Sequence, residues 1–283
     1  MITGMPRIAI AVRDFSNTVA TFRDKFGMPV MDLSGTSVDD LGAKLAMCVP
    51  GSGSNIEIMS PADPAAPLSV SLQRFLDRRG EGLFALMLEA PDPNAEAELL
   101  LDRGLNVLPL MAGAGGRDVH PNSTHGVLVR VYPVDSYKAD DTDKVDPPDL
   151  SGITRVIIAV NDLEHASRVY GKMFALDTSG IKVDPERGVG SVICTPPSGG
   201  QIELVSVEDA TRPFAKSIGA FLESHQEGMY ALVLSSHNLP ELANRLTTQG
   251  LVVRMSADSP DCLELERADM FGALLRIEAR RPD

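Results

Sequence analysis

The sequence contains few cysteines, and they follow no regular spacing. Cys48, Cys194 and Cys262 are odd in number and form no CxxC pair. A scattered set of this kind supports neither a disulfide framework nor a thiolate metal cluster. We therefore expect three buried, reduced thiols.

Long apolar runs and basic residues are scarce as well. No apolar run approaches the roughly 20 residues that span a bilayer, and no basic N-terminal stretch precedes an apolar core. The 26 basic residues are outnumbered by 39 acidic ones, which gives a net charge of −13. This charge disfavours nucleic acid and anionic membranes as partners. We expect a cytoplasmic protein, with no nucleic-acid or membrane partner, that acts on a small molecule.

What the sequence does contain is a repeat. Residues 5–12 read MPRIAIAV, and residues 154–160 read TRVIIAV, so that Arg155 matches Arg7. Later matches include Glu57 with Glu203. The offset is 148 residues at the start and 146 afterwards, which implies a deletion of two residues between the halves. A repeat of this length indicates two similar domains.

The length supports the same division. A chain of 283 residues is long for one compact core and typical of two domains. Residues 136–150 are acidic, contain proline and have few large aliphatic side chains, as a linker does. We place the first domain at residues 1–135, the linker at 136–150 and the second domain at 151–283.

The first domain opens with a strand followed by a helix. Ile8, Ile10 and Val12 alternate with Arg7, Ala9 and Ala11, which is the period of a strand. Asp14 is a suitable helix N-cap for the segment that follows. Strands are expected at 43–49 and 55–60, a helix at 70–78, a strand from 82, a helix at 95–103, and strands at 106–110 and 126–132. The opening pattern returns at 81–92, so the first half is itself duplicated.

These units resemble the vicinal oxygen chelate superfamily of glyoxalases and bleomycin-resistance proteins. The segments RIAIAVRD, FLDRRGEGLFALMLEAPD and GAGGRDVHPNSTHGVLVRV are most similar to methylmalonyl-CoA epimerases. The resemblance implies an α+β fold of two tandem domains, each built of paired βαβββ modules that form a curved mixed sheet around a pocket, with helices on the convex side. It also suggests that the halves pack as two chains of a single-domain dimer do, and that the protein can form a homodimer.

Members of this family bind a divalent metal through four residues on the concave face of the sheet. The matching positions here are Arg7, Glu57, Ala85 and Arg130 in the first domain. In the second domain they are Arg155, Glu203, Ala231 and Arg276. Arginine is a permanent cation that donates but does not accept hydrogen bonds, so it replaces a metal ion rather than binding one. We expect no metal and no other cofactor.

The arginines allow two interpretations. Two arginines and one glutamate carry a formal charge of +1, which favours binding of an anionic oxygen, and Ala9, Ala11 and Ala85 would leave space beside them. Alternatively, the arginines and the glutamate satisfy one another and fill the former cavity as a buried ionic cluster. The residues alone leave both interpretations open.

Further residues are expected to contact substrate in the pocket of either domain. Phe84 and Tyr230 take a position where the epimerases have a second histidine, and Lys44 aligns approximately with their catalytic glutamate. His120 and His125 lack a neighbouring cysteine or third histidine that would indicate zinc. The substrate-binding set is His120, Lys44, Phe84, Arg155, Glu203, Tyr230 and Arg276.

Two functions follow from these residues. One is a metal-independent isomerase, epimerase or lyase that acts on a small carboxylate or thioester-like substrate with an anionic or carbonyl group, in which Arg7 and Arg130 hold an oxyanion and Glu57 transfers a proton. The other is a non-catalytic protein that binds or sequesters a small molecule, as in the bleomycin-resistance branch. A ring-cleaving dioxygenase is disfavoured, because the aligned positions supply no two-histidine, one-carboxylate iron site.

Overall fold

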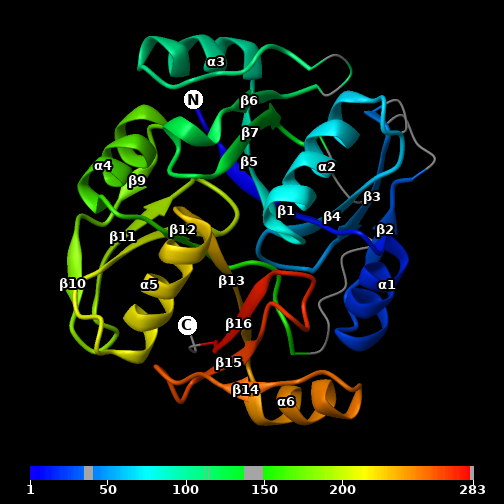
Figure 1. Cartoon of the computed structure of the whole chain (residues 1–283), viewed down its shortest axis with the longest axis vertical. Helices are drawn as coiled ribbons and strands as arrows, with labels where there is room; N and C mark the ends of the chain where they lie inside the picture. Colours follow the sequence, from blue (N-terminus) through cyan, green and yellow to red (C-terminus); the bar gives the residue numbers. More distant parts are fainter. Residues whose placement is uncertain (35–40, 112, 114, 137–148, 281–283) are drawn as a thin grey trace.

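Each half of the chain forms one mixed sheet in the computed structural model, which describes residues 1–34, 41–111, 113, 115–136 and 149–280 (Figure 1). The first sheet has seven strands in the order β2-β3-β4-β1-β5-β7-β6. Its strands are β1 (Gly4–Ala11), β2 (Val30–Asp32), β3 (Ala43–Cys48), β4 (Asn55–Pro61), β5 (Gly82–Ala90), β6 (Arg117–Val119) and β7 (Leu128–Pro133).

The second sheet has nine strands and repeats this topology. Its main path is β10-β11-β12-β8-β13-β16-β15-β14, and β9 also pairs with β11. Its strands are β8 (Arg155–Ala159), β9 (Asp177–Thr178), β10 (Lys182–Asp184), β11 (Val189–Thr195), β12 (Gln201–Val207), β13 (Gly228–Ser236), β14 (Arg254–Met255), β15 (Cys262–Leu265) and β16 (Leu274–Ala279). In both sheets the central pair, β1 with β5 and β8 with β13, is antiparallel.

Several helices begin at a residue whose side chain caps them. Asp14 accepts a hydrogen bond from the Asn17 N–H at the start of α1 (Phe15–Ala20), which continues as the π-helical turn η1 (Thr21–Lys25). Asp92 caps α3 (Pro93–Asp102) in the same way. The other helices are α2 (Pro67–Arg79), the short turn η3 (Pro121–Ser123), α4 (Leu163–Ser167) with η5 (Arg168–Met173), α5 (Pro213–His225) and α6 (Leu239–Thr248). Of these, α2 and α5 have no side-chain cap.

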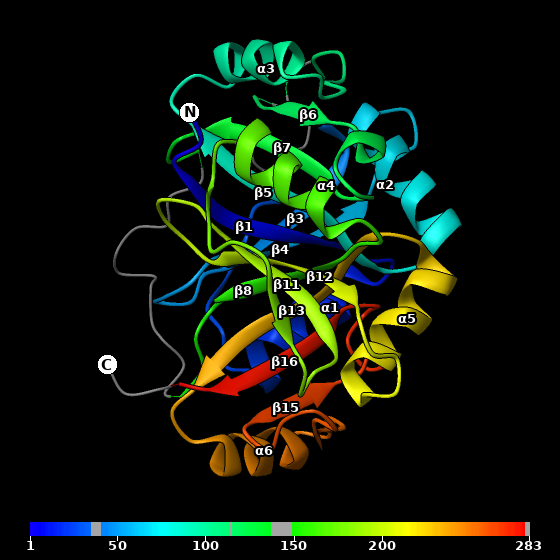
Figure 2. The same cartoon turned by 90° about the vertical axis from the view of Figure 1, so that its left-hand side faces the viewer.

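The helices cover both faces of the sheets, which differs from the expectation that they lie on the convex side alone. The core face of β1 contributes Ile8 and Ile10 to a large cluster shared with α1, α3, α4 and α6. The opposite face carries Ala9 and Ala11, and α2 packs there; α5 packs on the same face of the second sheet. Figure 2 shows α2 and α5 along one side of the molecule, with α3 and α6 at its two ends.

The two halves pack against each other. Isolated bridges join Met5 to Gly199 and Ser54 to Ile153, and one hydrophobic cluster runs through both halves. Most of the expected linker, 137–148, lies outside the described residues. The strand expected at 106–110 is reduced to one bridge between Val107 and Val119. No helix in the described part of the chain is long and apolar enough to cross a membrane.

Candidate functional site

The first arginine cluster lies on the α2 side of the first sheet. Ala9 pairs with Glu57 on β4 and with Ala85 on β5, so strand register places all three on the face of Arg7. The Arg7 Nε donates a hydrogen bond to the Glu57 carboxylate at 3.2 Å. Arg7, Glu57 and Arg130 are each only 1% exposed. The structure therefore brings together the three residues expected to be catalytic, but in a buried setting.

Asp118 belongs to this cluster, although it is not among the residues predicted from the sequence. It lies opposite Arg130 on β6, and it accepts a hydrogen bond from Arg130 Nε at 2.8 Å. Two arginines therefore face two carboxylates, and the expected formal charge of +1 becomes zero. The repeat offered a signal, because Asp118 and Glu264 are acidic residues 146 positions apart.

An aromatic ring completes the cluster. The guanidinium carbons of Arg7 and Arg130 lie 4.7 Å and 5.5 Å from the centre of the Tyr132 ring. Burial raises the pKa of Tyr132, while Arg130 opposes this shift. Burial also disfavours the charge of Arg130, but the neighbouring Tyr132 and Asp118 outweigh it and raise the pKa of Arg130. The terminal Nη1 and Nη2 of Arg130 are buried without a hydrogen-bond partner.

The small side chains beside these arginines are covered by α2. Ala9, Ala11 and Ala85 are fully buried, and they share a hydrophobic cluster with Leu68, Leu72 and Leu76 of α2. α2 packs over this face and closes it to solvent, and the expectation that the small side chains leave space beside the arginines stays a prediction.

The second cluster is built around Glu203. Its carboxylate forms ion pairs with Arg155 at 2.8 Å and with Arg187 at 2.6 Å. Arg155 also pairs with Glu278 at 2.6 Å. Arg187, in the turn before β11, has no counterpart among the aligned positions and was not predicted from the sequence.

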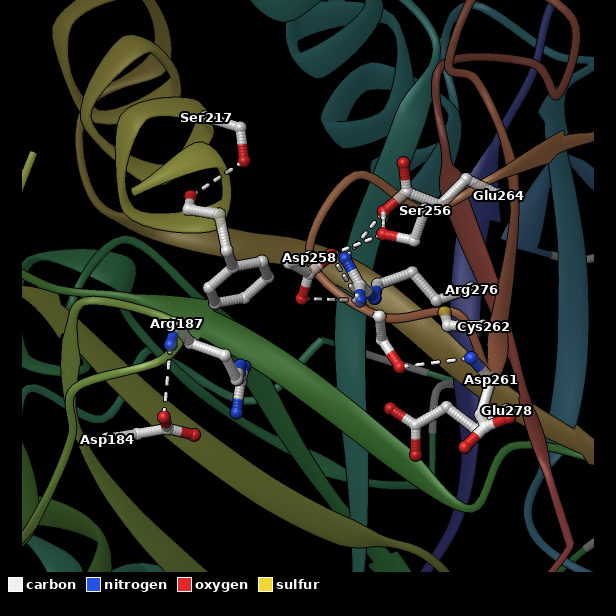
Figure 3. A network of polar contacts seen from close by, with 12 residues as sticks. Asp184, Arg187, Ser217, Ser256, Asp258, Asp261, Cys262, Glu264, Arg276 and Glu278 are labelled. Atoms are coloured by element: carbon white, nitrogen blue, oxygen red, sulfur yellow. Dashed lines mark hydrogen bonds and ion pairs between the residues drawn. The ribbon is translucent and has the colours of Figure 1, made fainter. Parts of the chain in front are cut away.

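Arg276 is held by two further carboxylates, as Figure 3 shows. It contacts Asp258 at 2.9 Å and also pairs with Glu264. Arg187 and Arg276 approach the ring of Phe214, at 4.1 Å and 5.0 Å. The cluster as a whole contains three arginines and four carboxylates, a formal charge of −1 rather than the expected +1.

The remaining substrate-binding residues are dispersed. Lys44 is exposed, and strand alternation turns it away from Ala43 and Leu45, which lie on the α2 side. The Tyr230 hydroxyl forms a hydrogen bond with Ser217 at 2.8 Å. Phe84 and His120, by contrast, line one cavity, so of this set these two are brought together in the first half.

This cavity lies beside the C-terminal half of α2 and measures about 550 Å³. That volume is within the usual range for small-molecule sites. Its wall combines apolar side chains with three arginines and a histidine, and one residue, Met229, comes from the second half. The lining residues are Ser71, Arg74, Phe75, Arg78, Arg79, Leu83, Phe84, Leu108, His120, Pro121, Gly126, Leu128 and Met229.

Two observations concern metal binding. The aligned positions supply one carboxylate in each domain, Glu57 and Glu203, and each is held by arginine. Across the residues that the structure describes, no group of three or more His, Cys, Asp or Glu side chains is placed to hold a metal ion.

Comparison with solved structures shows the fold. A triple mutant of 4-hydroxymandelate synthase from Streptomyces coelicolor matches with a TM-score of 0.70 and 14% identity, over 99% of this chain and 94% of that one. A xylose isomerase-like TIM barrel/4-hydroxyphenylpyruvate dioxygenase fusion protein matches with a TM-score of 0.61 and 14% identity, over 100% of this chain and 49% of that one. Methylmalonyl-CoA epimerase from Mycobacterium tuberculosis gives a TM-score of 0.41 and 22% identity, over 49% of this chain and 93% of that one.

Comparison of sequences assigns the family. No curated protein matches this chain. The profile of the Glyoxalase/Bleomycin resistance protein/Dioxygenase superfamily matches twice, at residues 7–120 and 154–260, which is more than half of the chain. The two matches fall on the two sheets and agree with the tandem repeat. The chain therefore belongs to the glyoxalase/bleomycin resistance protein/dioxygenase superfamily.

Proposed function

We propose that the protein binds a small organic anion in the cavity beside α2, as a binding or sequestering protein. The observation that carries this proposal is the lining of the cavity, in which the exposed Arg74, Arg78 and Arg79 lie beside apolar residues that include Phe75 and Phe84. Apolar walls supply affinity and a few charged groups fix orientation, as is typical of small-molecule sites.

The charge of the buried clusters supports this choice of site. Each arginine at the aligned positions already faces carboxylates, so neither cluster has positive charge to spare. The three arginines of the cavity, in contrast, form no ion pair in the described part of the chain. As exposed side chains they are available to pair with an anion.

Binding without turnover is tested with the purified full-length protein. Native mass spectrometry should reveal a co-purifying small acid, and calorimetry with that compound should give one site per chain. Stoichiometric binding with no chemical change of the compound supports sequestration. Conversion of the compound by catalytic amounts of protein contradicts it.

A second candidate is proton transfer by Glu57 in a metal-independent isomerase or lyase, with Arg7 and Arg130 as the oxyanion-binding groups. It is favoured by the two buried, unpartnered nitrogens of Arg130, which are suited to an oxyanion. Because Arg130 is 1% exposed, neighbouring side chains would have to move before a substrate could reach these nitrogens. When the protein is incubated with the bound acid in deuterium oxide, deuterium should then be incorporated at the carbon next to the carbonyl group of the acid. Full exchange by a Glu57→Gln variant would rule out this base.

A further inference from the structure

The two halves contain the same backbone turn with different side chains. In the first half the Gly126 N–H donates to the carbonyl of Pro121 at 2.9 Å; in the second half the Gly272 N–H donates to the carbonyl of Arg267 at 2.8 Å. Both pairs are separated by 146 positions. Pro121 and Arg267 are therefore structurally equivalent residues.

Arg267 lies over two aromatic rings of the second half. Its guanidinium carbon lies 5.1 Å from the centre of the Phe221 ring and 4.8 Å from that of Tyr230, and it donates a hydrogen bond to the carbonyl of Tyr230. Burial lowers the pKa of Arg267. A planar cation of the protein itself thus occupies the space above this aromatic pair.

In the first half the corresponding space is open. Phe75 and Phe84 are the equivalents of Phe221 and Tyr230, and their rings meet edge to face at 5.3 Å. The ring of Pro121 is too short to cover them. All three residues line the cavity of about 550 Å³. The cavity is therefore the region that Arg267 fills in the other half.

The charge around the two sites also differs. Arg74, Arg78 and Arg79 line the open cavity, whereas residues 146 positions later in the second half are Ala220, Ser224 and His225. No carboxylate is found among the described residues that line the cavity. Arginines in the last turn of a helix also interact favourably with the helix dipole. However, α5 has the same length as α2 and ends without an arginine.

We propose that the cavity binds a planar aromatic or conjugated carboxylate. Its ring lies against Phe75 and Phe84, where Arg267 stacks in the other half, and its carboxylate is held by the arginines of α2. This inference rests on the proposed binding function. The experiment must therefore separate the effect of the ligand's planarity, which tests this inference, from the effect of its charge, which tests anion binding.

Calorimetry with the full-length protein and three simple probes makes this separation. The probes are 2-naphthoate, which is planar and anionic; 2-naphthylmethanol, which is planar and neutral; and cyclohexanecarboxylate, which is anionic but not planar. We expect one site for 2-naphthoate, with affinity on the order of tenfold or more above either other probe.

Variants that introduce the equivalent residues of the second half into the first half locate the site. Pro121→Arg introduces the side chain that covers the rings there, and should abolish 2-naphthoate binding. The double variant Arg74→Ala/Arg78→Ser removes two cavity arginines, and should weaken 2-naphthoate on the order of tenfold while leaving 2-naphthylmethanol unchanged. Arg23→Ser/Arg212→Ser changes the net charge equally at exposed positions outside the cavity, and should leave both probes unaffected.

A reciprocal variant, Arg267→Ala, uncovers the second aromatic pair and should add a second site for the neutral probe. Unchanged circular dichroism and unfolding midpoints identify variants that remain folded. Equal affinity for 2-naphthoate and cyclohexanecarboxylate would overturn the planar ligand while leaving anion binding intact. Absence of binding by both anions, or 2-naphthoate binding that persists in folded Pro121→Arg protein, would overturn the assignment of this site.

Discussion

Asp118→Ala should be among the most destabilising single changes in the first half. Arg130 is 1% exposed and the Asp118 side chain 11% exposed, so this ion pair is largely shielded from water. Removing one partner of such a pair costs about 3–5 kcal/mol, because the remaining charge is left buried without its counter-ion. Arg130 would keep its contact with Tyr132 and the attraction of Glu57, which places the expected loss near the lower figure.

A double-mutant cycle separates the ion pair from simple packing. Asp118→Leu/Arg130→Met replaces both charges by apolar side chains, a change that is often neutral or stabilising. The free energy of unfolding, measured by urea titration with circular dichroism, should therefore be close to wild type for the double variant and much lower for each single variant. Asp24→Ala, at the exposed Arg23–Asp24 pair, serves as the control and should have no measurable effect.

The outcome that contradicts this reasoning is additivity. If the double variant lost as much stability as the two single variants together, the two side chains would not interact energetically. A loss below about 1 kcal/mol for Asp118→Ala would have the same meaning, because only a solvent-exposed pair is worth so little.

Two further substitutions and one labelling experiment test separate parts of the structure. Gly126→Ala should cost at least about 2 kcal/mol in urea unfolding, because φ is 77° and the new Cβ would lie 2.0 Å from the carbonyl oxygen of Glu227; Gly250→Ala, at φ 80° with open space, should show only the smaller backbone strain. Arg267→Ala should raise the pKa of His225 in an NMR titration, because burial and then Arg267 lower this pKa in the folded protein. Folding therefore favours neutral His225, and this contribution to stability is present at high pH and is lost as the pH falls through the lowered pKa of the folded protein. A thiol reagent at pH 8 should label native protein far more slowly than unfolded protein, because burial raises the pKa of all three thiols, to about 12 in Cys194, about 11 in Cys262 and higher in Cys48.

The repeat, the longer strands and helices of the first half and the cap at Asp14 could be predicted from sequence, because each depends on local periodicity or on a match between the halves. The short strands β2 and β6 were not expected, and the strand expected at 106–110 is a single bridge. The burial of the first cluster could not. The leucines of α2 show a helical period, but which sheet face they cover depends on the return path of the chain between β4 and β5.

The two counter-ions that were not predicted from the sequence illustrate a related limit. Asp118 lies on the three-residue strand β6, and only its pairing with β7 places it beside Arg130. Arg187 lies in the stretch where the two-residue deletion prevents alignment, so no match with the first half identified it. In both cases the charge of the cluster was set by residues outside the aligned positions, 12 and 16 positions away from the side chains that they pair with.

Two corners, the turns at His125 and at Phe271, lie where the two halves meet. They distinguish side chains that the fold requires from those that it merely accommodates. At each corner a glutamate, Glu81 or Glu227, accepts a backbone N–H, at 2.6 Å and 2.7 Å. The residue at the turn differs: His125 bonds to Glu227, whereas Phe271 takes the same left-handed conformation at the other corner. The glutamates therefore carry the shared geometry, and the histidine does not. The same reasoning applies to Pro121 and Arg267, whose backbones match while only one side chain leaves an aromatic pair uncovered. Because the fold forms with either residue, the open cavity is a property of the first half and not a requirement of the architecture.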